Sequence, residues 1–164
     1  SNDGSRGLGD VYKRQTLDDA QILLDWRNDP LTRAQSRHTE PLAWNGHLAW
    51  LTRVLTSPDC LLLVGTLAGD GIGSVRFARH DQGELWEVSI ALDPMWRGQG
   101  LGSRLLPAAV TELRRHHPRA AVVAAVRPGN RASEALFLGA GFRPADSAES
   151  FAHYRLEPPP EQKG

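Results

Sequence analysis

Apolar side chains in the first third of the chain recur at the three- and four-residue spacing that is typical of amphipathic helices. The first stripe consists of Ala20, Leu23 and Leu24. Thr16 followed by Asp19 resembles a capping box at its start, and Pro30 closes the helix because proline has no amide hydrogen to donate. The second stripe consists of Trp44, Leu48, Leu51 and Leu55. We therefore expect two helices in this third of the chain.

The middle of the chain predicts strands instead. Residues 61–67 and 72–79 each read as a strand, and the sequence Gly69-Asp70-Gly71 between them predicts a hairpin turn. Residues 84–92 alternate between apolar and polar side chains and end at Asp93-Pro94, which indicates a third strand followed by a turn. These three strands form an antiparallel meander.

The last third of the chain alternates between helix and strand patterns. An apolar stripe starts at about Leu101, and residues 120–126 form a short, wholly apolar run that is typical of a buried central strand. Asn130 can cap a last helix that extends to Gly139, and residues 151–155 can form a final strand. The pattern adds one strand–helix–strand unit to the meander.

Composition indicates a single globular domain. The chain has 164 residues, of which 40% are hydrophobic and 23% charged. We expect residues 16–156 to form the domain, with residues 1–15 a disordered tag or truncated segment and residues 157–164 a flexible tail.

The charge balance and the cysteine content indicate which binding partners and which cellular compartment to expect. Nineteen basic residues balance nineteen acidic ones, so neither nucleic acid nor a membrane surface is an expected partner. No apolar run approaches the roughly 20 residues that a membrane helix requires. Cys60 is the single cysteine, which excludes an internal disulfide and suits a reducing compartment. We expect a soluble cytoplasmic protein, either a monomer or a homodimer.

A glycine-rich turn joins the third strand to the following helix, with the sequence Arg97-Gly98-Gln99-Gly100-Leu101-Gly102. Glycines allow a ligand to approach the backbone, and a helix start offers unpaired amide donors and a partial positive charge. Such a turn suits a phosphate group, to which Arg97 and Arg104 could add charged hydrogen bonds. The glycine spacing differs from the dinucleotide-binding fingerprint, and Gly102-Ser103 lacks the lysine of a P-loop, which disfavours a nucleotide-binding fold.

Two motifs carry a family resemblance. The pattern R-x-x-G-x-G at Arg97, Gly100 and Gly102, preceded by Ile90-Ala91-Leu92-Asp93-Pro94, resembles the acetyl-CoA pyrophosphate loop of the GNAT superfamily of N-acetyltransferases. A second block, Asn130-x-x-Ser133-x-x-Leu136-Phe137-x-x-x-Gly141-Phe142, resembles the other signature of that family. The resemblance spans residues 17–155. It implies an α/β (α+β) fold with a mixed, mainly antiparallel sheet of six to seven strands flanked by about four helices, with acetyl-CoA as co-substrate and no metal.

The resemblance also implies where the coenzyme lies. In this family the pantetheine arm lies between splayed strands four and five, so residues 90–92 should hold it, with the Leu92 amide near the thioester oxygen. The coenzyme contacts implied are Ile90, Ala91, Leu92, Arg97, Gly98, Gln99, Gly100, Leu101, Gly102, Ser103, Asn130, Ser133 and Phe137. Asn130 is equally compatible with a plain helix cap, and the two roles can coexist.

Acid–base candidates follow from the reaction, because an amine attacks a thioester only when it is neutral. Glu87 is the candidate base, acting directly or through a water, and Ser89 and Glu84 are the alternatives. Alternation puts Glu87 and Ser89 on one face of the strand and Glu84, Trp86, Val88 and Ile90 on the other. The three catalytic candidates are Glu87, Ser89 and Leu92. A solvated strand carboxylate is an equally valid interpretation of Glu87. The family's usual acid is a tyrosine where this chain has Phe137, so Tyr154, Ser133 or a water would have to protonate the leaving thiolate, unless it leaves unassisted.

The acceptor is indicated less directly. The run Trp26-Arg27-Asn28-Asp29-Pro30, followed by His47-Leu48-x-Trp50, resembles family members that acetylate amino groups on nucleotide-linked sugars, as in pseudaminic-acid synthesis, and less closely the ribosomal-protein N-acetyltransferases. The substrate-binding candidates are Trp26, Arg27, Asn28, Arg33 and His47.

Alternative interpretations of the same residues stay open. Arg27, Arg33 and Arg37 could meet a sugar diphosphate and Trp26, Trp44 or Trp50 could stack on a ring, or these residues could be core and solvated surface. A peptide N-terminus or a small-molecule amine is the alternative acceptor, and a non-catalytic acyl-CoA-binding module is the alternative function. The histidines show no metal-ligand spacing.

Overall fold

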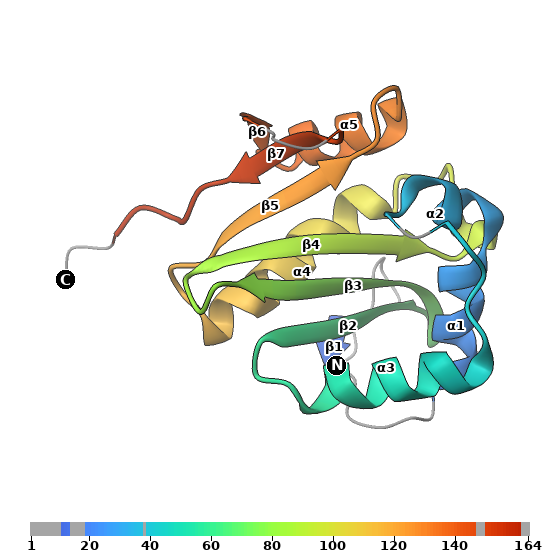
Figure 1. Cartoon of the computed structure of the whole chain (residues 1–164). Coiled ribbons are helices and arrows are strands. Elements are labelled where there is room, and N and C mark those ends of the chain that lie inside the picture. Colours follow the sequence, from blue (N-terminus) through green and yellow to red (C-terminus); the bar gives the residue numbers. More distant parts are fainter. Residues whose placement is uncertain (1–10, 14–18, 38, 147–149, 162–164) are drawn as a thin grey trace.

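A mixed sheet runs through the computed structural model, which describes residues 11–13, 19–37, 39–146 and 150–161. The strand order is β1-β2-β3-β4-β5-β7-β6, and every neighbouring pair is antiparallel except β4 and β5, which are parallel. The strands are β1 (Val11–Lys13), β2 (Cys60–Leu67), β3 (Asp70–His80), β4 (Leu85–Leu92), β5 (Ala121–Val126), β6 (Arg143–Ala145) and β7 (Ala152–Leu156). The predicted mainly antiparallel sheet with one strand–helix–strand unit is confirmed (Figure 1).

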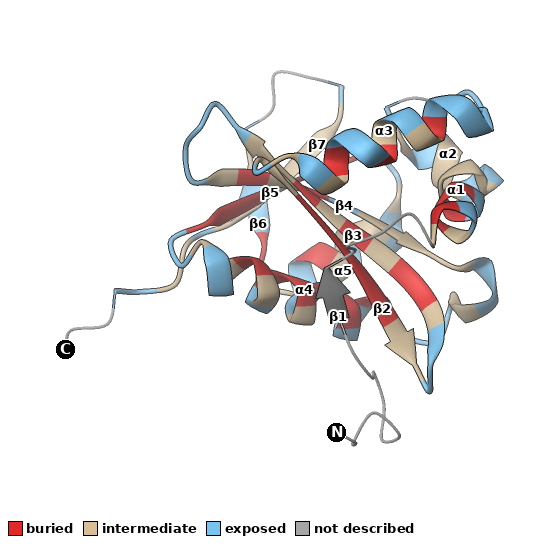
Figure 2. Ribbon diagram, turned by 90° about the horizontal axis from the view of Figure 1, so that it is seen from below, coloured by how far each residue is buried: buried red, intermediate tan, exposed pale blue. Residues whose placement is uncertain are grey.

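Helices cover both faces of this sheet. They are α1 (Ala20–Asn28), α2 (Pro30–Gln35), α3 (Trp44–Thr56), α4 (Gly102–His116) and α5 (Arg131–Gly139). Figure 2 shows α1 and α3 on one side of the sheet and α4 and α5 on the other. The sheet is therefore the middle layer of three, and a separate apolar core lies on each of its faces.

Alternation along β4 divides its side chains between these layers. Trp86 and Val88 are buried in the core beneath α4, whereas Glu87 and Ser89 point to the opposite face. The predicted assignment of the two faces is therefore confirmed. It places the polar positions of β4 toward α1 and α2, where a ligand can reach them.

Helix α2 was not predicted from the sequence. Pro30 was expected only to end the first helix, yet it also begins the next one, because the first position of a helix needs no amide donor. The Asp29 carboxylate caps this new helix by accepting hydrogen bonds from the amides of Leu31 and Thr32. Thr16, the other half of the expected capping box before α1, lies outside the described residues.

The sheet also reaches beyond the expected start of the domain at residue 16. Strand β1 pairs antiparallel with β2, with Tyr12 opposite Val64. At the other end, Arg114 donates a hydrogen bond to the carbonyl oxygen of Glu157 at 2.7 Å, and Arg119 donates one to that of Pro159. Ordered contacts thus extend into residues 11–13 and 157–159.

An irregularity in strand pairing opens the space for the candidate site. The parallel pairing of β4 with β5 covers only Leu85, Trp86 and Glu87, after which the two strands diverge (Figure 1). On its other edge β4 stays paired with β3 as far as Leu92. The end of β4 is therefore a fixed strand with one main-chain edge turned toward open space.

Candidate active site

A cavity of about 1020 Å³ lies where β4 and β5 diverge. It is lined by parts of α1 and α2, β3, β4, the glycine turn, β5 and α5. The predicted catalytic residues that line it are Glu87, Ser89 and Leu92. The predicted coenzyme contacts that line it are Ile90, Ala91, Leu92, Arg97, Gly98, Gly100, Leu101, Gly102, Ser103, Asn130, Ser133 and Phe137. The fold thus brings two sequence blocks about thirty residues apart into one site.

The glycine turn forms one end of the cavity. Gly98 and Gly100 have φ angles of 77° and 75°, a region that side chains other than glycine rarely adopt. A Cβ atom at either position would meet nothing within 4 Å, so the backbone there faces open space. Helix α4, 15 residues long, begins at Gly102, and its first amides have no acceptor within the helix. Gly102 and Ser103 both line the cavity. Open backbone at a helix N-terminus fits a phosphate group.

Arg97, which lines the cavity, is also bonded within the protein. Its guanidinium donates hydrogen bonds to the Asp29 carboxylate at 2.5 Å and to the Thr32 hydroxyl at 3.0 Å. Burial opposes the ionised form of Asp29, but the hydrogen bond and charge of Arg97, together with the hydrogen bonds from the amides of Thr32 and Leu31, outweigh it and hold the pKa of that carboxyl below its usual value. Arg97 therefore ties the glycine turn to the start of α2.

A second contact ties the same two regions together. The indole nitrogen of Trp26 on α1 donates a hydrogen bond to Asp93 at 2.8 Å, and the other oxygen of Asp93 caps the short 3-10 turn η2 (Pro94–Trp96) through the amide of Met95. Gln99, another predicted coenzyme contact, does not line the cavity, and its side chain donates a hydrogen bond to the carbonyl oxygen of Met95. Contacts outside the cavity thus fix the glycine turn, and the backbone at its glycines stays accessible to a ligand.

Helix α5 forms the opposite wall. The side-chain oxygen of Asn130 accepts a hydrogen bond from the amide of Ser133, which confirms its role as a helix cap. Its side-chain nitrogen donates to the Ser133 hydroxyl and to Gln35 of α2, both at 2.9 Å. Arg127, just before α5, donates to the carbonyl oxygen of Ser36 at 2.5 Å. The end of α2 and Ser36 therefore contact the loop before α5 and the residue that caps it.

The position of the missing tyrosine is an apolar wall. Phe137 is buried and packs edge-on against Phe142, with ring centroids 5.1 Å apart. Tyr154, one of the groups considered as an acid, is buried in the core beneath α4 and does not line the cavity. Of the two protein groups considered, Ser133 is therefore the one with access to a ligand.

Glu87 lies between two basic side chains. Arg37, which follows α2, forms an ion pair with one of its carboxylate oxygens, and the Nε2 atom of His80 lies 3.2 Å from the other. The Glu87 side chain is 19% exposed, so it is shielded but still reachable from the cavity. Ser89, two residues along the same face, accepts a long hydrogen bond of 3.4 Å from Arg76.

Four of the five predicted substrate contacts do not line the cavity: Trp26, Asn28, Arg33 and His47. Asn28 exchanges two hydrogen bonds with the main chain of Leu42, and Arg33 donates to the carbonyl oxygens of Asn28 and Thr39. These side chains therefore support the wall of the cavity through contacts inside the protein. Arg27 is the exception, because it lines the cavity itself.

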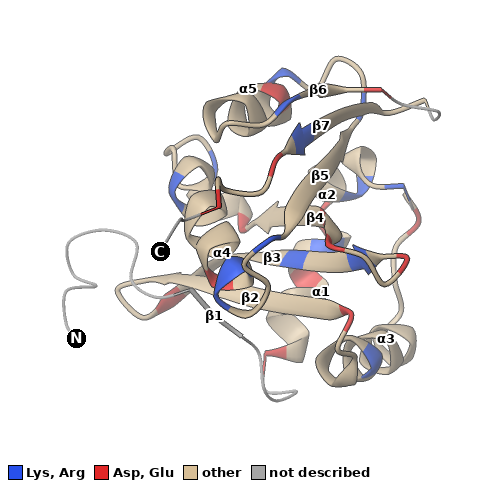
Figure 3. Ribbon diagram, turned by 90° about the vertical axis from the view of Figure 1, so that its left-hand side faces the viewer, with Lys and Arg blue, Asp and Glu red and all other residues tan. Residues whose placement is uncertain are grey.

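Arg76 lines the cavity but was not predicted as a site residue, although the sequence carries a signal for it. Arg76 lies on β3 between the buried residues Val75 and Phe77, so alternation turns it to the polar face. The hairpin register places it directly opposite Ser89. Figure 3 shows basic positions along β3, whereas β2 beside it has no charged residue.

Comparison with known proteins gives one family match. Residues 12–143 match the model of the "Acetyltransferase (GNAT) domain" family. No curated protein matches the chain by sequence. In the described part of the chain, no helix has both the length and the apolar character needed to cross a membrane.

Solved structures with the same fold are distant in sequence. An N-acetyltransferase from Staphylococcus aureus Mu50 is 22% identical, with a TM-score of 0.74 over 90% of this chain and 98% of that one. A putative acetyltransferase from Salmonella typhimurium, solved with its cofactor acetyl-CoA, is 20% identical, with a TM-score of 0.73 over 96% and 98%. A ribosomal-protein-alanine N-acetyltransferase from Brucella melitensis is 20% identical, with a TM-score of 0.75 over 90% and 98%.

Proposed function

The chain belongs to the GNAT acetyltransferase family, and from that premise we propose that it transfers an acetyl group from acetyl-CoA directly to a primary amine in the cavity between β4 and β5. The observation that carries this proposal is the open, positive-φ backbone at Gly98 and Gly100 next to the start of α4. It offers main-chain amides to a diphosphate, which is the charged part of coenzyme A.

The diverging strands support the same placement. Beyond Glu87, the edge of β4 that faces β5 has no partner strand in the described residues, so its amides and carbonyls are available to an extended ligand. A pantetheine arm carries two amides that can pair with such an edge. We assign residues Ile90, Ala91 and Leu92 to this role, and the buried ring of Phe137 to the apolar wall beside it.

Glu87 is the group assigned to remove the proton from the amine. The amine nitrogen forms a bond to the thioester carbonyl carbon, the carbon–sulfur bond breaks, and the proton leaves to Glu87 directly or through a water. Arg37 and His80 hold the Glu87 carboxylate in place. A water or the Ser133 hydroxyl reprotonates the thiolate. Holding both reactants in one cavity supplies much of the acceleration, roughly 7 kcal/mol or more.

The acceptor in this proposal is the amino group of a nucleotide-linked amino sugar. Arg27, Arg37 and Arg76 line the cavity around the polar face of β4, so the site favours an acceptor that carries negative charge. Polyamines and other cationic amines are disfavoured for the same reason. A peptide N-terminus is the second candidate, because its single charge is lost when the amine is deprotonated.

A thiol-release assay tests the function. The purified chain is incubated with acetyl-CoA and, in separate reactions, a nucleotide-linked amino sugar, an N-terminal peptide and a polyamine, with an acceptor-free reaction as the control. The proposal predicts acceptor-dependent release of free coenzyme A, fastest with the nucleotide-linked sugar. Binding of coenzyme A without turnover of any amine would instead indicate a non-catalytic acyl-CoA-binding module.

A further inference from the structure

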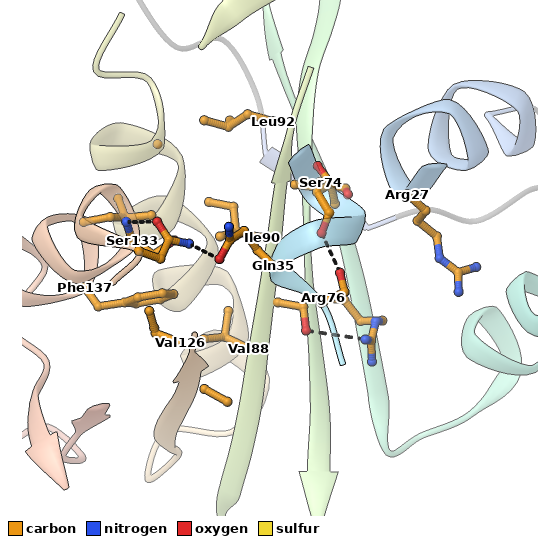
Figure 4. Close-up of a pocket in the computed structure, with 18 of the residues that line it drawn as sticks. Arg27, Gln35, Ser74, Arg76, Val88, Ile90, Leu92, Val126, Ser133 and Phe137 are labelled. Atoms are coloured by element: carbon orange, nitrogen blue, oxygen red, sulfur yellow. Dashed lines mark hydrogen bonds between the residues drawn. The ribbon is translucent and has the colours of Figure 1, made fainter. Parts of the chain in front are cut away.

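Two arginines converge at the acceptor side of the cavity without carboxylate partners. Arg27 comes from α1 and Arg76 from β3, and both line the cavity. Among the residues that the structure describes, neither forms an ion pair with a carboxylate, whereas Arg37, Arg79 and Arg97 pair with Glu87, Asp59 and Asp29. Figure 4 shows Arg27 and Arg76 on the opposite side of β4 from Ser133 and Phe137.

The same tryptophan lies beneath both guanidinium groups. The central carbon of the Arg27 guanidinium lies 3.7 Å from the centroid of the Trp50 ring, and that of Arg76 lies 5.6 Å from it. Burial lowers the pKa of Arg27 to about 10, and repulsion from Arg76 adds to the shift. Burial likewise lowers the pKa of Arg76, although Glu87 partly opposes this. Two desolvated cations side by side are stabilised when an anion binds between them.

A buried histidine fixes the direction of Arg27. Arg27 donates a hydrogen bond to Nδ1 of His47 at 3.0 Å, so that nitrogen must be the acceptor and Nε2 carries the proton that is donated to the carbonyl oxygen of Ala20 at 2.8 Å. The His47 ring is fully buried and stacks on Trp50, with centroids 5.8 Å apart and planes at 25°. His47 is thus a positioning residue, held in its neutral form, that aims Arg27 across the face of Trp50.

From this geometry we infer that Arg27 and Arg76, above Trp50, form a binding subsite for a phosphate group of the acceptor. Two guanidinium groups supply two positive charges and a fork of donors each, which matches a doubly charged phosphate or diphosphate better than a single carboxylate. The inference rests on the proposed function for the amine, but the subsite itself is defined by these side chains alone.

The register of the sheet sets the span between this subsite and the reaction centre. Arg76 lies opposite Ser89, which is three residues before Leu92 on β4, or roughly 10 Å along the strand. The acceptor amine must reach the neighbourhood of Leu92 while its phosphate lies near Arg76. A single sugar ring between an amine and a phosphate fills such a span. The glycine turn lies beyond Leu92, so the coenzyme diphosphate occupies a different end of the cavity.

Direct anion binding provides the first test. Protein saturated with coenzyme A, which occupies the glycine turn, is titrated calorimetrically with inorganic pyrophosphate. We expect R27Q and R76Q each to weaken pyrophosphate binding about 10-fold or more, because hydrogen bonds to a charged group are lost. The matched control is R53Q, which removes an exposed arginine of α3 that does not line the cavity. Equal affinity in all four proteins, or no binding to the wild type, would overturn the subsite.

Selectivity between acceptors provides the second test. The ratio of kcat/KM for a phosphorylated amino sugar to kcat/KM for the same sugar without phosphate should fall about 10-fold or more in R76Q. R76K, which keeps the charge, provides a second variant if R76Q does not fold. A fall in both rates with no change in their ratio would overturn the inference but leave the acetyl transfer intact. Pyrophosphate binding that needs Arg27 and Arg76, in a protein that acetylates no amine, would leave the subsite standing and remove the proposed function.

Discussion

At the glycine-turn end of the cavity the groups available to a ligand are main-chain amides, whereas at the Arg27–Arg76 end they are side chains drawn from α1 and β3. The turn is continuous in sequence, and Gly98 and Gly100 give it a backbone shape that other residues rarely adopt. The arginine end depends on a hairpin register and on a histidine from a third element. A site built from backbone leaves a short motif in the sequence, and a site assembled from distant side chains does not.

The two ends are nevertheless coupled by specific hydrogen bonds. Arg97 of the glycine turn bonds Asp29 at the start of α2, and Trp26 of α1 bonds Asp93 at the end of β4. The sequence run from Trp26 to Asp29 was interpreted as a substrate-binding motif. In the structure the terminal residues of this run, Trp26 and Asp29, instead bond to the glycine-turn end, and Arg27 is the residue of the run that lines the cavity.

The largest expected effect comes from closing the backbone site. G100V adds a side chain in a positive-φ turn and fills the open space in front of the amides. We expect the affinity for coenzyme A, measured by calorimetry, to fall about 10³-fold, since two or more charged hydrogen bonds are lost. The matched control is G69V in the β2–β3 turn, where φ is 89° and a Cβ is also unobstructed, but which does not line the cavity. Equal losses of affinity in both variants would attribute the effect to backbone strain rather than to the site.

A smaller effect is expected at the acceptor end, and on rate rather than on coenzyme affinity. E87Q removes the proposed base, so kcat at neutral pH should fall about 10²-fold. The loss should be greatest at low pH, where free amine is scarce, and coenzyme A should bind as tightly as before. E84Q, an exposed residue before β4 that does not line the cavity, provides the control. A pH–rate profile of E87Q parallel to that of the wild type would remove Glu87 from the mechanism.

The smallest effect concerns the support of Arg27. Burial, aided by the charge of Arg27 and opposed by the hydrogen bond to Ala20, lowers the pKa of His47 below the ordinary 6.5. The unfolded chain therefore binds more protons below pH 6.5, and the free energy of unfolding should decrease as the pH falls from 6.5 toward the lower folded-state value. Burial lowers the pKa of His117 as well, so the two histidines act in the same direction.

H47Q can keep both hydrogen bonds but cannot titrate, so it should flatten this pH dependence in urea unfolding at pH 7.5, 6.5 and 5.5. H116Q removes an exposed histidine at the end of α4 and provides the control. If the unfolding free energies of H47Q and the wild type fell in parallel, His47 would not be held neutral in the folded protein.

Much of the fold was predictable because its patterns are strong. The alternation of β4 identified that strand and the face it buries, since apolar residues recur there at regular spacing. The period of α3 identified the helix but not its exact face, because the structure buries His47, Leu51 and Val54 and leaves Trp44 of the predicted stripe 42% exposed. The prediction missed α2 because Pro30 was taken only as a helix stop, and the short strand β6 because three residues carry no detectable period.

The residues of the candidate site likewise divide into those that the sequence could predict and those that it could not. The glycine turn and the orientation of Glu87 could be predicted, because each depends on local spacing alone. Trp26 and His47 were interpreted as substrate contacts, because a sequence does not distinguish a polar group bonded inside the protein from one that faces a ligand. Arg76 needed the β3–β4 register, which follows only once the hairpin is counted residue by residue.

The central claim is that the main chain of the glycine turn binds the diphosphate of coenzyme A. The most direct measurement is a titration with coenzyme A followed through the backbone amide resonances of the protein. We predict that the largest shifts fall on Gly98 to Ser103, with a second group on residues 88–92 of β4. Saturable binding that leaves the amides of Gly98 to Ser103 unshifted would contradict the claim.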